Sequence, residues 1–260
     1  MTNIEKISNI ILKHSNDGIS RIILNEPKTY NSLSSNMLKS LIQCFQKLND
    51  DETTKVIIIE GSEKGFSAGH NLKEIKSLQG KPEYNTLFNL CSELMLKIIN
   101  NSKPVIAKVH GAAFAAGCQL VASCDLAISS DDAIFATPGV NIGLFCSTPM
   151  VALSRNINRK NTMKMILTGE SITAQQAKTI GLINDHFKNS NLEDEVIKLA
   201  EIIASKSNKV IKIGKKAFYK QLEMPLDEAY KFTSQVMSEN MMTLDAKEGI
   251  SAFLETRTPD

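Results

Sequence analysis

The sequence is organised around residues 111–120, which read Gly-Ala-Ala-Phe-Ala-Ala-Gly-Cys-Gln-Leu. The apolar run 104–110 before them predicts a buried strand, and residues 120–123 after them predict the first turns of a buried helix. The chain therefore leaves a strand, turns on small residues, and enters a helix whose first amide groups lack partners and carry partial positive charge. The small residues either allow tight packing of helix on strand, or let a negative oxygen of another molecule approach these amides.

A second segment has the same order of strand, glycine-containing loop and helix start. Residues 55–60 predict a strand, and the loop that follows contains Phe-Ser-Ala-Gly-His-Asn-Leu at 66–72. These seven residues resemble the F-[SCA]-[AS]-G-x-[DN]-L motif of the crotonase (enoyl-CoA hydratase/isomerase) family. Residues 110–120 resemble that family's second motif, [NH]-G-x-[AC]-x-[AG]-[GA]-G-x-x-L. The two motifs stand in the family's order and spacing, and the resemblance covers nearly the whole chain.

The fold class that the sequence predicts is α/β. Short strands are expected at 9–13, 19–24, 55–60, 104–110, 125–128, 133–136 and 182–184, with helices between them. Asn16-Asp17-Gly18 predicts a hairpin turn between the first two strands. The resemblance implies the ClpP/crotonase-like fold, a spiral of β-β-α units. We expect an α/β core with an acyl-CoA site over residues 1–190 and a helical oligomerisation region over 191–260.

The predicted C-terminal helices, at 192–204, 210–222, 226–242 and 245–254, carry many apolar residues. Phe218, Phe232, Met237 and Met241 are among them. Such a surface packs on another subunit or only covers its own core. The resemblance implies the first, because the C-terminal helices of the family build a trimer that often stacks into a hexamer. We therefore expect a homotrimer or a hexamer that is a dimer of trimers.

Composition excludes several classes of partner. A net charge of +2 gives no reason to expect nucleic acid or a charged membrane surface, and no apolar run reaches membrane-spanning length. The N-terminal residues show neither a signal-peptide nor a transit-peptide pattern. The cysteines lie in apolar runs without CxxC spacing and predict reduced, buried thiols; they are Cys44, Cys91, Cys118, Cys124 and Cys146. We expect a cytoplasmic location.

The resemblance implies a site for acyl-CoA thioesters. The thioester carbonyl would lie between the backbone N–H groups of His70 and Ala116, an oxyanion hole for a developing enolate. Coenzyme A is then part of the substrate, and we expect no separate cofactor; no residue cluster has metal-ligand spacing. The family's substrate contacts correspond to Lys28, Tyr30, Ala68, Gly69, His70, Asn71, Leu72, Lys73, Phe145 and Cys146, with Phe253 and Arg257 reaching the nucleotide of a neighbouring subunit. For Lys28 and Lys73 the alternative is solvated surface charge.

The sequence departs from the family at both proton-transfer positions. Hydratases of the family use two glutamates as acid and base on one water molecule. Here these positions are Gln119 and Gly139, the latter at the end of Phe-Ala-Thr-Pro-Gly, 135–139. An amide does not transfer a proton at neutral pH and glycine has no side chain, so standard hydration is expected to be weak or altered.

Two side chains are candidates to replace the glutamates. His70 titrates near neutrality, and Cys146 acts as a nucleophile if its thiolate is stabilised. The alternatives are that His70 is a hydrogen-bonded wall of the site and that Cys146 is a small apolar filler. His110 is expected to be structural, and Asp125 is expected to be buried and hydrogen-bonded.

The sequence lacks two common nucleotide-binding motifs and leaves two function hypotheses. The glycines at 111 and 117 do not form a P-loop, because Cys118-Gln119 stand where Lys-Ser/Thr is needed, and no GxGxxG opens the first strand–helix unit. The first hypothesis is an enoyl-CoA hydratase-like lyase or isomerase of fatty acid metabolism. The second is a non-catalytic acyl-CoA-binding protein that keeps the oxyanion hole for recognition. Gln119 and Gly139 favour the second hypothesis, whereas the retained loops suit both.

Overall fold

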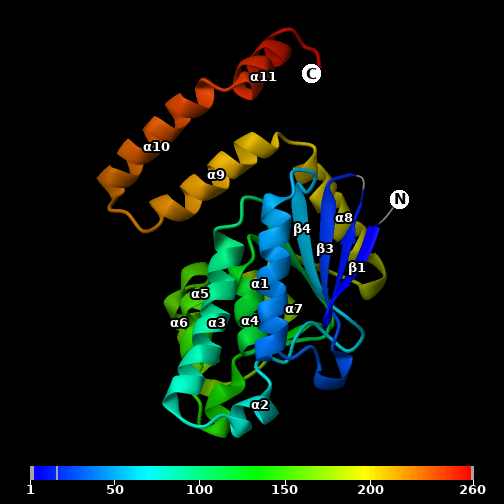
Figure 1. Ribbon diagram of the computed structural model, residues 1–260. Coiled ribbons are helices and arrows are strands. Elements are labelled where there is room, and N and C mark those ends of the chain that lie inside the picture. The colour runs from blue at the N-terminus through cyan, green and yellow to red at the C-terminus, as the bar shows by residue number, and fades with distance from the viewer. Residues whose placement is uncertain (1–2, 16, 259–260) are drawn as a thin grey trace.

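The computed structural model describes residues 3–15 and 17–258 (Figure 1). Its main sheet has seven strands in the order β1-β2-β3-β4-β5-β7-β10. The first three strands pair antiparallel and the remaining pairs are parallel. The strands are β1 (Asn3–Ile7), β2 (Ile10–His14), β3 (Ile19–Leu24), β4 (Val56–Gly61), β5 (Val105–Val109), β7 (Leu126–Ser130) and β10 (Asp185–Phe187).

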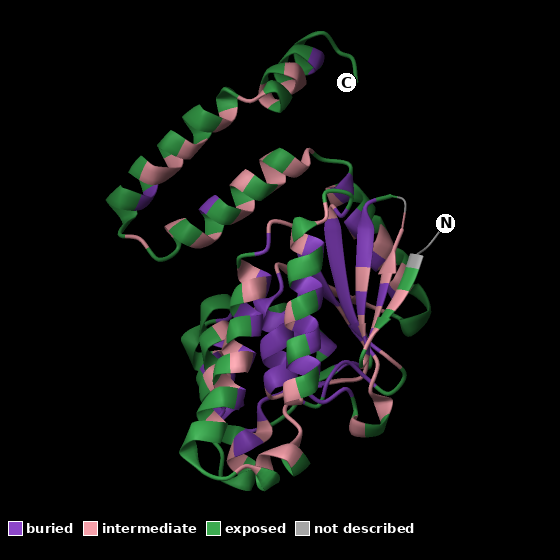
Figure 2. Cartoon of the chain, viewed as in Figure 1, coloured by how far each residue is buried: buried purple, intermediate pink, exposed green. Residues whose placement is uncertain are grey.

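Helices cover both faces of this sheet, which is why its central strands are apolar throughout. In β4, Ile57 and Ile59 pack with α1 (Ser35–Asp50) and α3 (Lys81–Ile99), whereas Ile58 faces α8 (Asn189–Ala204). This alternation follows the two-residue period of a strand. Figure 2 shows the central strands buried between the helices. The helix that covers the second face of the sheet, α8, therefore begins only after residue 188.

A smaller, three-stranded sheet positions the loops described below. It has the order β6-β8-β9, with β6 parallel to β8 and β8 antiparallel to β9. These strands are β6 (Ala112–Phe114), β8 (Ile134–Ala136) and β9 (Ile172–Thr173). The short helical elements around it are η1 (Pro27–Thr29), α2 (Leu72–Ser77), α4 (Ala116–Ser123), η2 (Pro138–Ile142), α5 (Ser147–Asn156), α6 (Arg159–Thr168) and α7 (Ala174–Ile180).

The last three helices project from the sheet as an arm (Figure 1). They are α9 (Asn208–Gln221), α10 (Leu226–Met241) and α11 (Leu244–Leu254). Lys215 on α9 attaches the arm, because its Nζ donates to Asp125 Oδ2 at 2.6 Å. Tyr219 donates to Asp125 Oδ1 at 2.9 Å. The expectation that Asp125 is hydrogen-bonded is therefore confirmed, with α9 supplying two of its partners, but the residue is only partly buried.

The predicted α/β architecture is confirmed, with local differences. The last strand is Asp185–Phe187 rather than 182–184, because Leu182 and Ile183 are buried in the core instead of pairing in the sheet. Strands β1, β6 and β9 were not predicted. The hairpin joins β2 and β3, with Gly18 at φ +84°, while Asn16 lies outside the described residues. Each helix within the described ranges is too short or too polar to cross a lipid bilayer.

Candidate active site

Two glycine-containing loops, 65–71 and 110–117, are joined by backbone hydrogen bonds. The N–H of Ser67 donates to the carbonyl of Ala112 at 3.0 Å, and the N–H of Phe114 donates to the carbonyl of Ser67 at 2.9 Å. A Cβ atom at Gly117 would lie 2.4 Å from the Ser67 carbonyl oxygen. The tight packing anticipated from the small residues is therefore present, because the loops meet where only glycine fits.

The same close approach brings two amide groups together. Gly69 has φ +85°, and a Cβ atom there would lie 2.8 Å from the Phe114 carbonyl oxygen and 3.2 Å from the Ala116 nitrogen. The Gly69–His70 peptide thus lies beside the first residue of α4. Over residues 3–15 and 17–258, neither the His70 N–H nor the Ala116 N–H donates a hydrogen bond. The start of a helix adds partial positive charge at this point.

Backbone strain orients the second amide. Ala115, just before α4, has φ +48° and ψ −116°, a conformation that side-chain-bearing residues rarely adopt. Its N–H donates to the carbonyl of Ala136 at 2.8 Å, which ties this residue to the end of β8. Strained residues of this kind are held in place by their surroundings and occur often at functional sites.

A buried asparagine that sequence reasoning missed supports the first loop. Asn31 Nδ2 donates to the carbonyls of Ser62 at 3.1 Å and Gly65 at 2.9 Å, while its Oδ1 accepts from the Glu26 N–H at 2.9 Å. Asn31 has φ +52°, which asparagine tolerates better than most residues. The sequence offered only this tolerance as a signal, since the three partners come from other parts of the chain.

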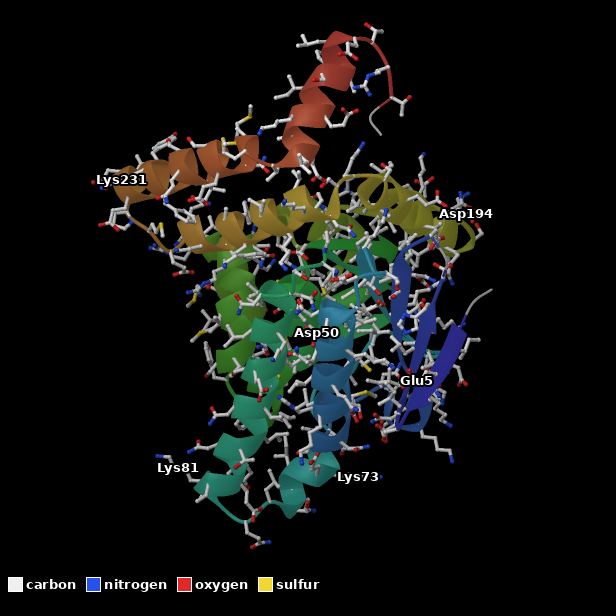
Figure 3. All side chains as sticks on the ribbon, turned by 45° about the horizontal axis from the view of Figure 1, so that its top comes forward. Glu5, Asp50, Lys73, Lys81, Asp194 and Lys231 are labelled. Atoms are coloured by element: carbon white, nitrogen blue, oxygen red, sulfur yellow. The ribbon has the colours of Figure 1, made fainter. Side chains whose placement is uncertain are left out.

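Five of the predicted substrate-contact residues lie at the surface. Lys28, Tyr30, Ala68, Leu72 and Lys73 are exposed. Figure 3 labels Lys73 on α2 at the end of the molecule away from the arm.

Two further interactions order this end. Asn71 caps α2, because its Oδ1 accepts from the N–H groups of Lys73 at 3.0 Å and Glu74 at 3.2 Å. Lys64, which was not predicted, places its Nζ 5.3 Å from the centre of the Tyr30 ring. Lys64 and Lys73 thus place exposed cationic side chains just before and just after this loop.

Phe253 and Arg257 lie elsewhere in the same chain. Phe253 is on α11 and is 84% exposed. Arg257 pairs with Glu248 and Glu255. In Figure 1 α11 lies at the opposite end of the molecule from α2. One chain therefore does not bring these residues to the two loops, and their contact with a neighbouring subunit's ligand stays a prediction.

The His70 side chain is fixed by its neighbours. Its Nδ1 lies 3.1 Å from the Leu33 carbonyl oxygen, and its ring packs edge-to-face on Phe88 with centroids 5.4 Å apart. Burial lowers the pKa of His70, while the Leu33 carbonyl and Glu74 act in the opposite direction. Its Nε2 is buried and has no hydrogen-bond partner among the residues that the structure describes.

The two positions where the family has glutamates differ from each other. Gln119 lies in the first turn of α4 and is 4% exposed, and its Oε1 has no hydrogen-bond partner within residues 3–15 and 17–258. A Cβ atom at Gly139 would lie 2.3 Å from the Leu144 carbonyl oxygen and 2.8 Å from Cys146 Sγ. The Leu144 N–H donates to the Gly139 carbonyl at 2.9 Å. The chain is thus folded back over residue 139, which leaves no room for a side chain.

The structure also locates the remaining candidates. Burial raises the pKa of Cys146, although the Gly139 backbone N–H acts in the opposite direction. The thiol is therefore protonated at neutral pH, which favours the filler interpretation, while Phe145 beside it is exposed. His110 Nε2 lies 3.2 Å from the Glu63 carbonyl oxygen. Among the described residues, no group of His, Cys, Asp and Glu side chains converges as a metal site would require.

Comparisons with known proteins agree with the motifs. The family model described as "Enoyl-CoA hydratase/isomerase" matches residues 14–260. Enoyl-CoA hydratase domain-containing protein 3, mitochondrial, from Homo sapiens is 49% identical over 243 residues, which cover 94% of this chain and 80% of that protein. The 2,3-dehydroadipyl-CoA hydratase of Escherichia coli (strain K12) is 32% identical over 240 residues, which cover 92% of this chain and 93% of that protein.

Solved structures show the same fold. A Mycobacterium smegmatis enoyl-CoA hydratase superposes with a TM-score of 0.96 at 42% identity, covering 98% of this chain and 99% of that one. Human enoyl-CoA hydratase domain-containing protein 3 superposes with a TM-score of 0.92 at 46% identity, covering 100% of this chain and 99% of that one. The crotonase fold that the resemblance implied is thereby confirmed.

The expected cytoplasmic location is wrong. Relatives from Rattus norvegicus, Homo sapiens and Mus musculus, 48%, 49% and 48% identical, are named mitochondrial, which points to a mitochondrial location. The expectation rested partly on reduced, buried cysteines. These indicate a reducing environment and do not identify the compartment.

Proposed function

The chain belongs to the enoyl-CoA hydratase/isomerase (crotonase) family, and on that premise we propose that it binds acyl-CoA thioesters with the thioester carbonyl between the N–H groups of His70 and Ala116. The observation that carries this proposal is the pair of adjacent, unpartnered amides at the glycine contact. Two fixed donors stabilise a carbonyl oxygen as negative charge grows on it, and loss of one such donor typically costs about 3–4 kcal/mol of barrier.

The coenzyme A part of the ligand lies along exposed side chains in and near the first loop in this proposal. Lys28 and Lys73 are exposed cations, suited to the phosphates of coenzyme A. Coenzyme A is part of the ligand in this proposal, so no separate cofactor takes part. The acyl group lies on the side of Gln119, Phe145 and Cys146.

The proposed chemistry is stabilisation of a thioester enolate with weak or altered hydration. Gln119 is a neutral amide, and the position of the second glutamate is Gly139, over which the chain folds back. Neither group can take a proton from water or return one at neutral pH. The oxyanion hole depends on backbone atoms alone, so these substitutions leave it intact.

A specific observation also favours a second candidate, a non-catalytic acyl-CoA-binding protein. The Leu144 carbonyl would lie 2.3 Å from any Cβ at residue 139, so a carboxylate cannot be restored there by a simple substitution. The two candidates share the same binding site. They differ in whether product forms when an enoyl-CoA is bound, and mass spectrometry of CoA esters after incubation separates them.

The test of ligand binding uses Ala116→Pro. Proline removes the N–H but is compatible with the first position of a helix. We expect calorimetric titration to show loss of acyl-CoA recognition, while free coenzyme A still binds weakly. Asn189→Pro is the matched control, because it places proline at the first position of α8, where the N–H donates no hydrogen bond to a described residue. Equal acyl-CoA affinity of folded Ala116→Pro and the unaltered protein would remove Ala116 from the site.

We also propose that the protein is a homotrimer or a hexamer. Leu244, Phe253 and Leu254 on α11 are 79%, 84% and 76% exposed, and Tyr230 on α10 is 69% exposed. Apolar side chains gathered in this way usually pack on another subunit. A neighbouring subunit would then bring Phe253 and Arg257 toward the nucleotide. Light scattering that shows a stable monomer at micromolar concentration would contradict this assembly.

A further inference from the structure

A small cavity lies where α9 begins, and its lining is strongly cationic. Its volume is about 230 Å³. Of the described residues, those that line it include four lysines and neither aspartate nor glutamate. The lysines are Lys55, Lys103, Lys209 and Lys212. Like charges gathered in one cavity repel each other and attract an anion, so this lysine cavity is suited to a negatively charged ligand.

The topology of the sheet separates the lysine cavity from the candidate active site. β4 and β5 are parallel neighbours. Lys55 immediately precedes β4, and Lys103 lies two residues before β5. The loops of the candidate active site follow the carboxyl ends of the same two strands, whereas the lysine cavity lies at their amino ends. Figure 1 shows α9 beginning at the end of the sheet away from α2.

Three of the four ammonium groups are not neutralised within the chain. Lys55 Nζ donates to the carbonyl of Ala204, the last residue of α8, at 3.2 Å. Over residues 3–15 and 17–258, the side chains of Lys103, Lys209 and Lys212 form no ion pair. Their charges are therefore available to a ligand.

The side chains in the lysine cavity lie close enough to affect one another. Burial lowers the pKa of Lys103, and the charge of Lys212 acts in the same direction. Asp51 and Glu52 act in the opposite direction, but neither of them lines the cavity. An anion placed between Lys103 and Lys212 would remove the repulsion between the two ammonium groups.

The groove between α1 and α3 differs in the charges of its lining, although it also contains lysines. Lys39, Lys47 and Lys97 share that groove with Asp50 and Glu93. Charges of both signs offset each other there, so the groove offers an anion much less attraction. The lysine cavity at α9 is distinguished by the sign of its charges as well as by their number.

The lysine cavity spans the junction between the sheet and the arm. Lys103 belongs to the segment that leads into β5, whereas Lys209 and Lys212 belong to α9. Lys215, which attaches the arm through Asp125, also donates to the Lys103 carbonyl at 2.9 Å. The N-terminus of α9 adds partial positive charge at this junction. An anion bound here contacts both the core and the arm.

We propose that the lysine cavity binds a small anion with two or more phosphate groups, held by Lys103 of the core and by Lys209 and Lys212 of α9. One phosphate group carries about −1.5 to −2 charges at pH 7, so three unpaired lysines match more than one such group. Ser102 and Asn208 in the lining supply further hydrogen-bonding groups. This site is additional to the proposed acyl-CoA site, and binding involves no covalent step.

The experiment is calorimetric titration of the unaltered protein with pyrophosphate, ATP and inorganic phosphate at constant ionic strength. We expect pyrophosphate to bind roughly tenfold or more tightly than inorganic phosphate and to raise the melting temperature, because it binds the folded state. ATP that binds as tightly as pyrophosphate supports recognition of the phosphates alone, and tighter binding of ATP supports a nucleotide ligand. No binding of pyrophosphate or ATP at millimolar concentration would overturn the proposal, as would equal affinities for pyrophosphate and inorganic phosphate.

Variants locate the anion. Lys209 and Lys212 are exposed, so Lys209→Gln and Lys212→Gln should fold normally while each removes one charge at similar length. We expect the double variant to bind pyrophosphate roughly tenfold more weakly, at two- to fivefold for each exposed charge. Lys216→Gln is the matched control, because Lys216 is exposed on the same helix but does not line the cavity. Unchanged affinity of the folded double variant would overturn the proposal.

One further variant separates this site from the proposed acyl-CoA site. Lys73→Gln removes a cation expected to contact coenzyme A, and we expect its affinity for pyrophosphate to stay unchanged. Weakened binding in Lys73→Gln, without weakening in the double variant of α9, would place the anion at the acyl-CoA site and contradict the separate cavity. Failure of acyl-CoA to bind would overturn the proposed function and leave the pyrophosphate result standing.

Discussion

Two regions of the molecule are built differently. The first is the pair of glycine-containing loops, 65–71 and 110–117, and the second is the segment 137–147. The loops are joined by backbone hydrogen bonds, and their glycines allow an approach that no Cβ permits. The segment 137–147 contains a family glutamate position and now carries glycine there, with Leu144 folded over it. Three of its residues, Ile142, Leu144 and Phe145, are exposed apolar side chains.

The difference shows how unequally substitution affects two parts of one site. A donor that is a backbone N–H survives a change of side chain, so His70 supplies the same amide that any residue would. A proton-transfer group exists only as a side chain, so replacing a glutamate by Gln119 or Gly139 removes it outright. In the proposed function, carbonyl binding is therefore retained where acid–base chemistry is lost.

The largest expected effect concerns hydration by the unaltered protein, which tests whether acid–base chemistry has been lost. We expect turnover of crotonyl-CoA to be several orders of magnitude below an ordinary enzymatic rate of about 10 per second, because each acid–base group typically contributes about 10²–10⁴-fold. Loss of the enoyl absorbance measures the rate. Turnover of about 10 per second or more would show that another residue supplies the base, and His70→Ala would be the next variant to measure.

A second prediction concerns the fold of the segment 137–147. Gly139→Ala should lower the free energy of unfolding by about 2–3 kcal/mol, because its Cβ would meet the Leu144 carbonyl and Cys146 Sγ. Urea denaturation measures this change. Gly214→Ala in α9, where an added Cβ meets nothing within 4 Å, is the control and should not destabilise. Unchanged stability of Gly139→Ala would mean that the segment 137–147 can shift to accommodate a side chain at little energetic cost, and that a glutamate can be restored.

A third, smaller effect is expected in the loops. Ala115→Gly should raise the free energy of unfolding by about 1 kcal/mol, because glycine adopts φ +48° without the strain that alanine carries there. The same urea experiment applies. If the variant were less stable than the unaltered protein, the loss of chain entropy on folding would outweigh the strain, and Ala115 would not be a strained support of the Ala116 amide.

The smallest expected effect is a pH dependence from His70. Burial places its folded-state pKa below the ordinary value of 6.5. The stability associated with the neutral ring is therefore fully present above pH 6.5 and is lost as pH falls through the folded-state pKa. We expect the urea midpoint to fall more between about pH 7.5 and about pH 5 in the unaltered protein than in His70→Phe. Parallel curves for the two proteins would contradict the buried, neutral assignment.

The sequence predicted those parts of the fold that depend on local pattern. Continuous apolar runs located β4 and β5, and helical spacing located α1 and the C-terminal helices. Strands β1, β6 and β9 were missed; β6 is three residues of Ala and Phe and β9 is two residues, and both pair with β8. The position of α8 on the second face of the sheet also depends on tertiary contacts, although its apolar spacing was evident.

The candidate site also combines features that the sequence motifs suggest with features that depend on tertiary contacts. The family resemblance implied that the N–H groups of His70 and Ala116 form an oxyanion hole, and this role stays a prediction, although the structure places Gly69, just before His70, close to the Ala116 nitrogen. The Asn31 hydrogen bonds and the contact of His70 with Leu33 could not be read from the sequence, since their partners lie up to 37 residues away. Gly139 was recognised as lacking a carboxylate, but the chain folded over it was visible only in the structure.

The ion pair between Lys215 and Asp125 joins residues 90 positions apart, and this separation has a consequence for synthesis on the ribosome. Domains generally fold as the chain emerges, N-terminal part first. Asp125 therefore leaves the ribosome long before α9 is available, and until then its carboxylate has the Val105 N–H as a partner but no cation. We expect the sheet of the nascent chain to carry the partly buried Asp125 carboxylate without a cationic partner until α9 is synthesised. Docking of α9 then becomes a late step that follows completion of nearly the whole chain.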